Sequence, residues 1–216
     1  KPETNDAAGR NAKIKAAIAE GYKTLVLPGY SFAESIVPLA SQYPDVKFIG
    51  LDISEWDLGN AYGKILHPEA DPNTVYEQYT IPANVATVTY SEEYSGYMAG
   101  YAAVTAGYKK LGFLGGMAIP AVQRFGWGYV QGAEQAATDG NIDGVSIKYQ
   151  YANTFDPHDA IKINMDSWYK TDKIEAIFVS GGGIFKSVGA SAMGAGVDKA
   201  KIIGVDTDQK EAIDSK

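Results

Sequence analysis

Cysteine is absent from these 216 residues, and histidine occurs only at His67 and His158. Without a thiol the chain can form no disulfide, no thiolate nucleophile and no cysteine-based metal site. The two histidines lie far apart in dissimilar sequence surroundings, so we interpret them as surface residues and not as part of a zinc site or a catalytic triad. We expect no metal and no cofactor.

Clusters of positive charge and long apolar runs are also missing. The net charge is −7, the pI is about 4.9, and no run of basic residues is longer than Lys109–Lys110. This argues against nucleic acid or an anionic membrane surface as a partner. No apolar stretch approaches the ~20 residues of a membrane-spanning helix, and no signal-peptide pattern opens the sequence. We expect these residues to begin and end inside a longer protein, because Lys1 leads into a helix and Lys216 falls where another helix begins.

The sequence lacks the common enzyme motifs as well. The glycines of 112–116 and 181–189 do not have the spacing of a dinucleotide-binding turn, and neither a phosphate-binding loop nor a hydrolase elbow is present. Glu92 and Glu93 are neighbours, but adjacent helical residues point about 100° apart, which disfavours a general acid/base pair. We therefore expect a protein that is not an enzyme.

The sequence does contain alternating strand and helix patterns. Residues Thr24–Leu27 form a short apolar run that ends at a Pro-Gly pair, which predicts a parallel strand buried on both faces. Ser31 and Glu34 have the spacing of a capping box. Further strands are expected at Val46–Leu51, Ala86–Tyr90, Lys110–Gly115, Val145–Tyr151, Ala176–Val179 and Lys201–Val205. Helices are expected at Asp6–Glu20, 31–43, Glu92–Gly107, Phe125–Ala137, Pro157–Tyr169 and Phe185–Ala195. Such alternation predicts parallel sheets flanked by helices.

Two segments of this pattern carry further expectations. Residues 53–82 have no sustained helical or strand period, which predicts a long surface excursion that either covers a binding site or packs as a flap without a ligand role. In the helix at Glu92–Gly107, the larger side chains fall on one stripe at helical spacing; they are Tyr94, Met98, Tyr101 and Tyr108.

Ligands of open parallel sheets bind beyond the carboxyl ends of the strands. The candidate residues there are Tyr30, Asp52, the glycines Gly181, Gly182 and Gly183, and Asp206. Asp206 is the first polar residue after an apolar strand, and its carboxylate could accept two hydrogen bonds from a ribose diol. The three glycines leave backbone amides open to a ligand, or simply form a tight strand-to-helix turn. Phe125 and Trp127 could stack on a base, or could fill the core.

Several strings give the chain a resemblance to a known family. They include LVLPGY at 25–30, GYMAG at 96–100, GFLGGMAIP at 112–120 and GVDTDQ at 204–209, and further matches lie at 19–22, 43–48, 84–90, 92–93, 124–125 and 128–129. The ordered set resembles the basic membrane protein family of substrate-binding lipoproteins, which includes receptors for purine nucleosides.

The resemblance implies a type I periplasmic-binding-protein fold, with two Rossmann-like lobes that close on a ligand in the cleft between them. Lobe I would be residues 1–90 without its first strand, lobe II residues 91–204, and residues 205–216 a hinge and a return to lobe I. The implied protein is a monomer on the outer face of the cell membrane. It would carry a lipid anchor on its N-terminal segment and deliver a nucleoside to the permease subunits of an ABC importer.

The resemblance also suggests roles for individual residues. Asp206 would bind the ribose hydroxyls beside the glycines at 181–183, and Glu93 and Phe125 would contact the base. Tyr94 stands where many members have Glu, and Ala118 where many have Asp. A ligand-sensing ectodomain of a signalling protein is an alternative, because the same lobes serve both purposes. A sugar or a vitamin is an alternative ligand.

Overall fold

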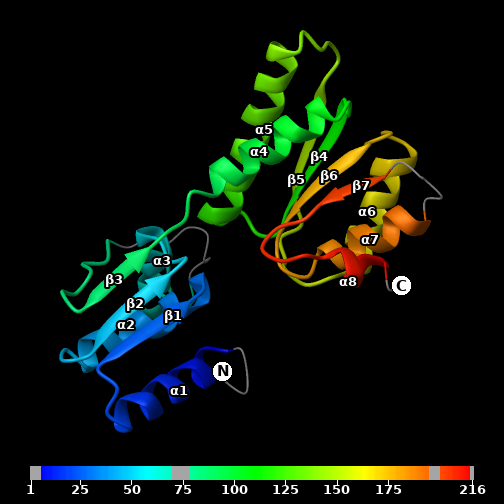
Figure 1. Cartoon of the computed structure of the whole chain (residues 1–216). Coiled ribbons are helices and arrows are strands. Elements are labelled where there is room, and N and C mark those ends of the chain that lie inside the picture. Colours follow the sequence, from blue (N-terminus) through cyan, green and yellow to red (C-terminus); the bar gives the residue numbers. More distant parts are fainter. Residues whose placement is uncertain (1–5, 70–77, 195–199, 215–216) are drawn as a thin grey trace. The chain divides into compact units, whose positions relative to one another are not determined.

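The structure is a computed structural model that describes residues 6–69, 78–194 and 200–214. It is an α/β protein with two parallel sheets (Figure 1). The chain forms two compact units, Lys1–Tyr90 and Ser91–Lys216. Residues 205–214 therefore belong to the second unit, and their return to lobe I stays a prediction. The parallel sheets with flanking helices confirm the predicted fold class, with one sheet in each unit.

The first unit contains a three-stranded sheet, called sheet A, in the order β1-β2-β3. Its elements are α1 (Ala7–Ala19), β1 (Thr24–Pro28), the 3-10 turn η1 (Tyr30–Phe32), α2 (Ala33–Gln42), β2 (Lys47–Leu51), α3 (Glu55–Leu66) and β3 (Val85–Val88). The predicted first helix is confirmed: Asp6 caps α1 by accepting a hydrogen bond from the Gly9 amide, and Gly21 follows its end with a φ of 96°.

The second unit contains a four-stranded sheet, called sheet B, in the order β5-β4-β6-β7. Its elements are α4 (Glu92–Thr105), β4 (Lys110–Gly115), α5 (Pro120–Asp139), β5 (Ser146–Tyr151), α6 (Asp159–Lys170), β6 (Ala176–Ser180), α7 (Phe185–Gly194), β7 (Lys201–Ile203) and α8 (Lys210–Asp214). Helix α5 begins five residues before the predicted start, because Pro120 occupies its first turn, where a missing amide hydrogen has no consequence.

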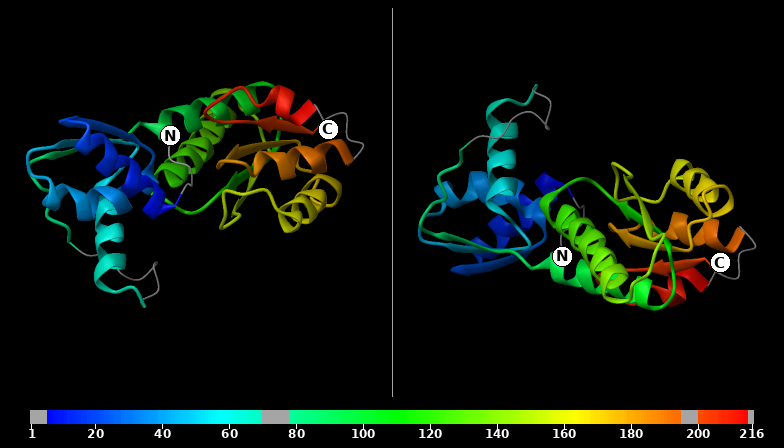
Figure 2. Two further views of the ribbon diagram at one scale, coloured as in Figure 1. Left: turned by 90° about the horizontal axis from the view of Figure 1, so that it is seen from below. Right: turned by 90° about the horizontal axis from the view of Figure 1, so that it is seen from above.

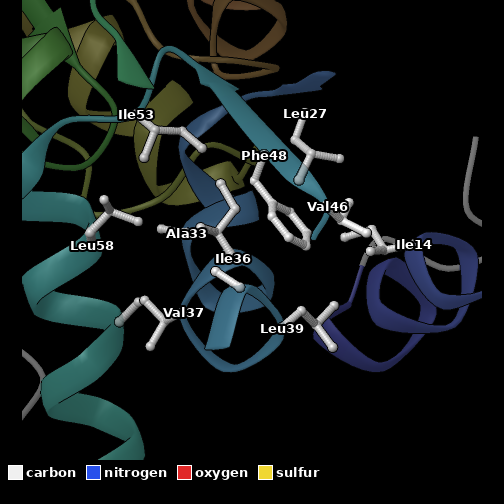
Figure 3. Packing of buried hydrophobic residues seen from close by; sticks show 12 residues of the cluster. Ile14, Leu27, Ala33, Ile36, Val37, Leu39, Val46, Phe48, Ile53 and Leu58 are labelled. Carbon is white, nitrogen blue, oxygen red and sulfur yellow. The ribbon is translucent and has the colours of Figure 1, made fainter. Parts of the chain in front are cut away.

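Among the described residues, helices cover only one face of sheet A. Leu27 and Phe48 point into a core that they share with Ile36 of α2 and Ile14 of α1 (Figure 3). Figure 2 shows α2 and α3 on the same side of this sheet. Val26, on the opposite face, is 55% exposed. The prediction that Thr24–Leu27 is buried on both faces is therefore wrong for these described residues, because β1 is an edge strand with one helical layer.

Two other expectations for the first unit are also wrong. Ser31 lies in the 3-10 turn η1, and α2 begins without a side-chain cap at Phe32, so Ser31 and Glu34 form no capping box. The capping box of this unit is at Ser54 and Asp57, and it starts α3. Helix α3 therefore occupies much of the predicted excursion at 53–82, of which residues 70–77 lie outside the described residues.

Helices α4 and α5 of the second unit cross in close contact through glycines (Figure 1). A Cβ atom at Gly132 would lie 1.9 Å from the Tyr97 carbonyl oxygen, and one at Gly100 would lie 2.0 Å from that of Tyr129. The residues of the predicted stripe divide: Tyr101 and Tyr108 pack against the core of the second unit, whereas Tyr94 is 69% exposed and Met98 is 63% exposed. The small residues of α4 are buried instead, because they allow the two backbones to approach.

Candidate functional site

The carboxyl ends of the strands in sheet A bring Tyr30 and Asp52 to one edge. Pro28, Leu51 and Val88 are aligned across β1, β2 and β3 as the last residues of their strands. The Gly29 amide donates a hydrogen bond to the Leu51 carbonyl, and the Asp52 amide donates one to the Val88 carbonyl, both at 2.8 Å. Tyr30 and Asp52 are half-buried at this edge, which is where parallel sheets bind ligands.

Sheet B has a corresponding edge. Gly115 of β4 is aligned with Tyr151 of β5 and with Ser180 of β6. Strand β7 runs parallel to β6, and their last aligned pair is Phe178 with Ile203. Gly181 comes directly after β6, and Asp206 comes three residues after the end of β7. Asp206 and the glycines 181–183 therefore follow two neighbouring strands at the same edge.

The three glycines form a turn that the surrounding backbone requires. A Cβ atom at Gly181 would lie 2.7 Å from the Gly116 amide nitrogen, and Gly182 has a φ of 48°. The Gly183 amide donates to the Phe155 carbonyl at 2.7 Å, so this amide is used within the chain. The alternative of a tight strand-to-helix turn is thus supported for Gly183, and any ligand contact of this turn falls to its neighbours.

Phe155 is a candidate that the sequence reasoning missed. It follows β5, its half-buried ring lies against Gly116, and its backbone contacts Gly182 and Gly183. A Cβ atom at Gly116 would come within 2.3 Å of this ring. The signal lies in the sequence, because Phe155 comes four residues after the predicted strand at Val145–Tyr151.

Backbone strain marks the same edges. Asp52, Asn153 and Asp206 have φ values of 58°, 57° and 67°, and each follows a strand. Left-handed conformations are unfavourable for residues with a Cβ atom and gather at functional sites. The other two such residues, Asn141 and Lys173, follow the ends of helices, where this conformation is common.

Asp206 has the electrostatics of a partly desolvated acceptor. Desolvation by burial raises the pKa of its carboxyl above the usual value, although the residue keeps an exposed surface. A cavity of about 510 Å³ lies between α7, β7 and α8; it is lined by Gly204, Thr207 and Asp208 among others, but not by Asp206 itself. This cavity is therefore separate from the edge that carries the candidate residues.

Glu93 lies in an ion-pair cluster at the start of α4. The Nε atom of Arg124 is 2.5 Å from a carboxylate oxygen of Glu92, which is 6% exposed, and 3.9 Å from Oε2 of Glu93. That Oε2 atom is buried and accepts no hydrogen bond within the described part of the chain. Since a buried acceptor without a donor is unfavourable, Glu93 is suited to receive an N–H group from a ligand.

The two aromatic candidates on α5 differ in position. The Phe125 ring packs edge-on against Phe178 in the core of the second unit, with 5.9 Å between the ring centroids. Trp127 is 65% exposed on the outer side of α5. Phe125 therefore contributes to packing, and neither ring lies on the glycines at the edge of the sheet as Phe155 does.

The described residues contain neither a candidate metal-binding cluster nor a candidate membrane-spanning helix. No group of three or more His, Asp or Glu side chains there is arranged to hold a metal ion. None of the helices between residues 6 and 214, outside the two undescribed gaps, is both long and apolar enough to cross a bilayer.

Comparison with known proteins identifies relatives across nearly the whole chain. The nucleoside-binding protein BmpA of an ABC transporter from Lactococcus lactis is 27% identical over 214 residues, which are 96% of this chain and 52% of that protein. Basic membrane protein D of Borreliella burgdorferi is 32% identical over 71% of this chain and 46% of its own length. The chain spans about half the length of these curated relatives.

Solved structures share the fold at lower identity. A solute-binding protein of an ABC transporter system from Aeropyrum pernix K1 has a TM-score of 0.65 at 23% identity, covering 96% of this chain and 52% of that one. Another from Conexibacter woesei has a TM-score of 0.60 at 22% identity, covering 93% and 56%. Transcription regulators are also similar: CcpA of Lactococcus lactis has a TM-score of 0.56 at 14% identity, covering 93% of this chain and 63% of that one, so the fold alone does not separate transport proteins from transcription regulators.

The family assignment depends instead on the sequence. The pattern of the Bmp family, described as ABC transporter substrate-binding protein PnrA-like, matches residues 3–215. The chain therefore belongs to the Bmp family of PnrA-like ABC transporter substrate-binding proteins, and it has the periplasmic-binding-protein type of fold.

Proposed function

We propose that this protein captures a nucleoside outside the cytoplasm for an ABC importer and does not transform it. The observation that carries the proposal is the carboxyl edge of sheet B, where Asp206, Phe155 and the glycine turn follow three parallel strands of one sheet, β7, β5 and β6. An acidic acceptor, an aromatic ring and backbone amides at one edge suit the sugar and the base of one small ligand. Tyr30 and Asp52, at the carboxyl edge of sheet A, are proposed as ligand-contacting residues of the first unit.

Asp206 is proposed to bind the ribose. Its carboxylate is partly desolvated, and two hydroxyl donors would replace the water that it has lost. Hydrogen bonds to a charged acceptor contribute about 1.5–3 kcal/mol each. The strained backbone at this residue supports the assignment, since strain persists at positions with a function.

Phe155 and Glu93 are proposed to recognise the base. The half-buried Phe155 ring rests on glycines and offers a flat apolar surface, while Oε2 of Glu93 needs a donor such as a base N–H group. The name of the Lactococcus relative, which calls it nucleoside-binding, agrees with this chemistry. Trp127 is the alternative residue for stacking on the base, because its side chain is exposed on α5.

The experiment compares Phe155→Ala with Trp127→Ala in the full-length polypeptide, by titration calorimetry with adenosine, guanosine and inosine. Loss of a stacking ring should weaken binding by about 1–3 kcal/mol, or roughly tenfold to a hundredfold, for Phe155→Ala only. Binding that depends on Trp127 and not on Phe155 would overturn the assignment of the ring. Binding of a sugar or a vitamin in preference to every nucleoside would overturn the ligand class.

Transport and location are proposed from the family. The protein is proposed to act as a monomer, to be lipid-anchored on the outer face of the cell membrane, and to dock on permease subunits. Fractionation of cells, followed by a protease-protection assay, tests the location. A full-length gene product with a membrane helix and a signalling domain would support a ligand-sensing ectodomain instead. Conversion of the nucleoside by the purified protein would contradict the absence of catalysis.

A further inference from the structure

The loop between β5 and α6, residues 152–158, is held by hydrogen bonds to other elements of the second unit, and it is called here the Phe155 loop. The Asn153 amide donates to the carbonyl of Gly116, which follows β4, at 3.0 Å. The Phe155 carbonyl accepts from the amide of Gly183, in the turn after β6, at 2.7 Å. The backbone around the aromatic residue is therefore fixed relative to sheet B.

Ser187 of α7 holds the end of this loop. Its side chain is buried, with 7% of its surface exposed, and a serine hydroxyl both donates and accepts hydrogen bonds. The Oγ atom accepts from the His158 amide at 2.9 Å and donates to the His158 carbonyl at 3.2 Å. The loop ends at His158, which is the N-cap of α6. One hydroxyl thus joins α7 to both backbone groups of the last loop residue.

The Phe155 ring takes its position from the backbone of the loop. The ring lies against two glycines: a Cβ atom at Gly116 would come within 2.3 Å of it, and one at Gly181 within 3.2 Å. Glycines have no side chain that could hold the ring from its sides. Movement of the loop would therefore slide the ring across these glycines, away from the place where a base could stack.

We propose that Ser187 is a positioning residue of the nucleoside site, whose hydroxyl keeps the Phe155 loop in the conformation that presents the ring to the base. This inference rests on the proposed function. Because Ser187 is buried and its hydroxyl is engaged by His158, it acts through the loop and not by contact with the ligand. The apparent affinity of a ligand falls with the fraction of molecules in the competent conformation, so a looser loop weakens binding although every ligand contact remains possible.

Ser191 offers a matched control on the same helix. It lies one turn after Ser187, it is fully buried, and its Oγ donates to Oδ1 of Asp166 on α6 at 2.7 Å. Removal of either hydroxyl leaves a polar partner without its hydrogen bond, so Ser187→Ala and Ser191→Ala should be destabilised to a similar degree. The bond of Ser191 ends in α6, whereas the bonds of Ser187 end in the Phe155 loop.

Titration calorimetry of the full-length polypeptide with inosine tests the inference. Ser187→Ala should weaken binding by about three- to tenfold, because the loop is then in place for a smaller fraction of the time. Ser191→Ala should change the affinity by less than about twofold, despite its similar loss of stability. In a Phe155→Ala background, Ser187→Ala should have no further effect, since the ring whose position it sets is gone.

Fluorine NMR of the ligand-free protein, with a fluorinated phenylalanine in place of Phe155, reports on the ring directly. The signal should shift or broaden in Ser187→Ala and stay unchanged in Ser191→Ala. A signal that is unchanged in Ser187→Ala, equal affinities of the two serine variants, or an equal effect of Ser187→Ala with and without the ring would overturn the positioning role and leave nucleoside capture intact. Absence of nucleoside binding in the wild-type protein would overturn the proposed function, and the positioning role with it.

Discussion

Asp206 combines a strained backbone with a partly desolvated charge, and both features are unfavourable in the ligand-free protein. Because the folded state raises the pKa of this carboxyl, the folded state holds the proton more tightly than the unfolded chain does. The stability that this proton contributes is therefore present at a pH below the usual Asp value of about 3.9, and it is lost as the pH rises through the raised pKa.

Asp206→Asn should accordingly separate stability from binding. Asparagine tolerates the left-handed conformation and removes the charge, so the thermal midpoint at neutral pH should stay equal or rise, and the difference should shrink in acid. Nucleoside affinity should fall by about tenfold to a hundredfold, because the amide replaces a charged acceptor. Asp208→Asn is the control, since it makes the same change of charge two residues away. Equal loss of affinity in both variants would contradict the role of Asp206.

Arg124 neutralises the buried Glu92 beside Glu93, so its removal leaves a carboxylate without its cation. Arg124→Gln should lower the free energy of unfolding by about 3 kcal/mol in urea titrations. Lys148→Gln, whose ion pair with Asp172 is on the surface, should change it by less than about 1 kcal/mol. Adding Glu92→Gln to Arg124→Gln should restore part of the loss. No difference between the Arg124 and Lys148 variants would show that the cluster at α4 is not a buried ion pair.

The crossing of α4 and α5 depends on glycines, and this could not be read from hydropathy. The sequence showed an aromatic stripe on α4, but large side chains cannot lie where two backbones touch. Tyr94 and Met98 therefore point outward, and Gly96 and Gly100 face α5. In the string GYMAG the two glycines are four residues apart, and this spacing indicates a packing role only once the partner helix is known.

Gly132→Ala tests this contact. A methyl group 1.9 Å from the Tyr97 carbonyl oxygen forces the helices apart, so the free energy of unfolding should fall by about 3 kcal/mol or more. Gly194→Ala at the end of α7 meets no atom within 4 Å, and should be neutral or slightly stabilising. Urea denaturation of both variants gives the comparison, and equal stabilities would contradict the close crossing.

Helix α3 is hidden in the sequence because residues 53–82 as a whole have no sustained helical period, although residues 55–66 do. Within it, Leu58 and Ala61 are buried three residues apart, which is helical spacing, and Ser54 with Asp57 begins the helix. The predicted capping box at Ser31 does not form, because Ser31 lies within the 3-10 turn η1 and not at the start of α2. The capping-box pattern therefore marks the start of a helix at Ser54 but not at Ser31.

Ser54→Ala should lower the free energy of unfolding by about 1 kcal/mol, because the Asp57 amide loses its acceptor and the Ser54 hydroxyl no longer contacts Asp57. Ser95→Ala, an exposed position within α4, should leave stability unchanged or slightly raised. Hydrogen exchange of the α3 amides should speed up in the first variant alone. Unchanged exchange would show that the cap does not hold this helix.

At the scale of the whole molecule, the order of strands and helices followed from the sequence except for α3 and the short α8, and the strand arrangement within each sheet did not. Apolar runs and glycine stops located the predicted strands to within a few residues. Which strand becomes an edge depends on contacts distant in sequence, and so Val26 was wrongly expected to be buried. The rule that ligands bind at strand ends selected Asp206 and Asp52, whereas Phe155 became visible once β5 was aligned with β4.

We propose that the carboxyl edge of sheet B recognises the sugar and the base of a nucleoside together. The most direct measurement is titration calorimetry of the full-length protein with a nucleoside, with its free base and with ribose. We predict saturable binding of the nucleoside at one site, weaker binding of either part, and loss of the sugar contribution in Asp206→Asn. Binding of the free base as tightly as the nucleoside, with no effect of Asp206→Asn, would contradict the account.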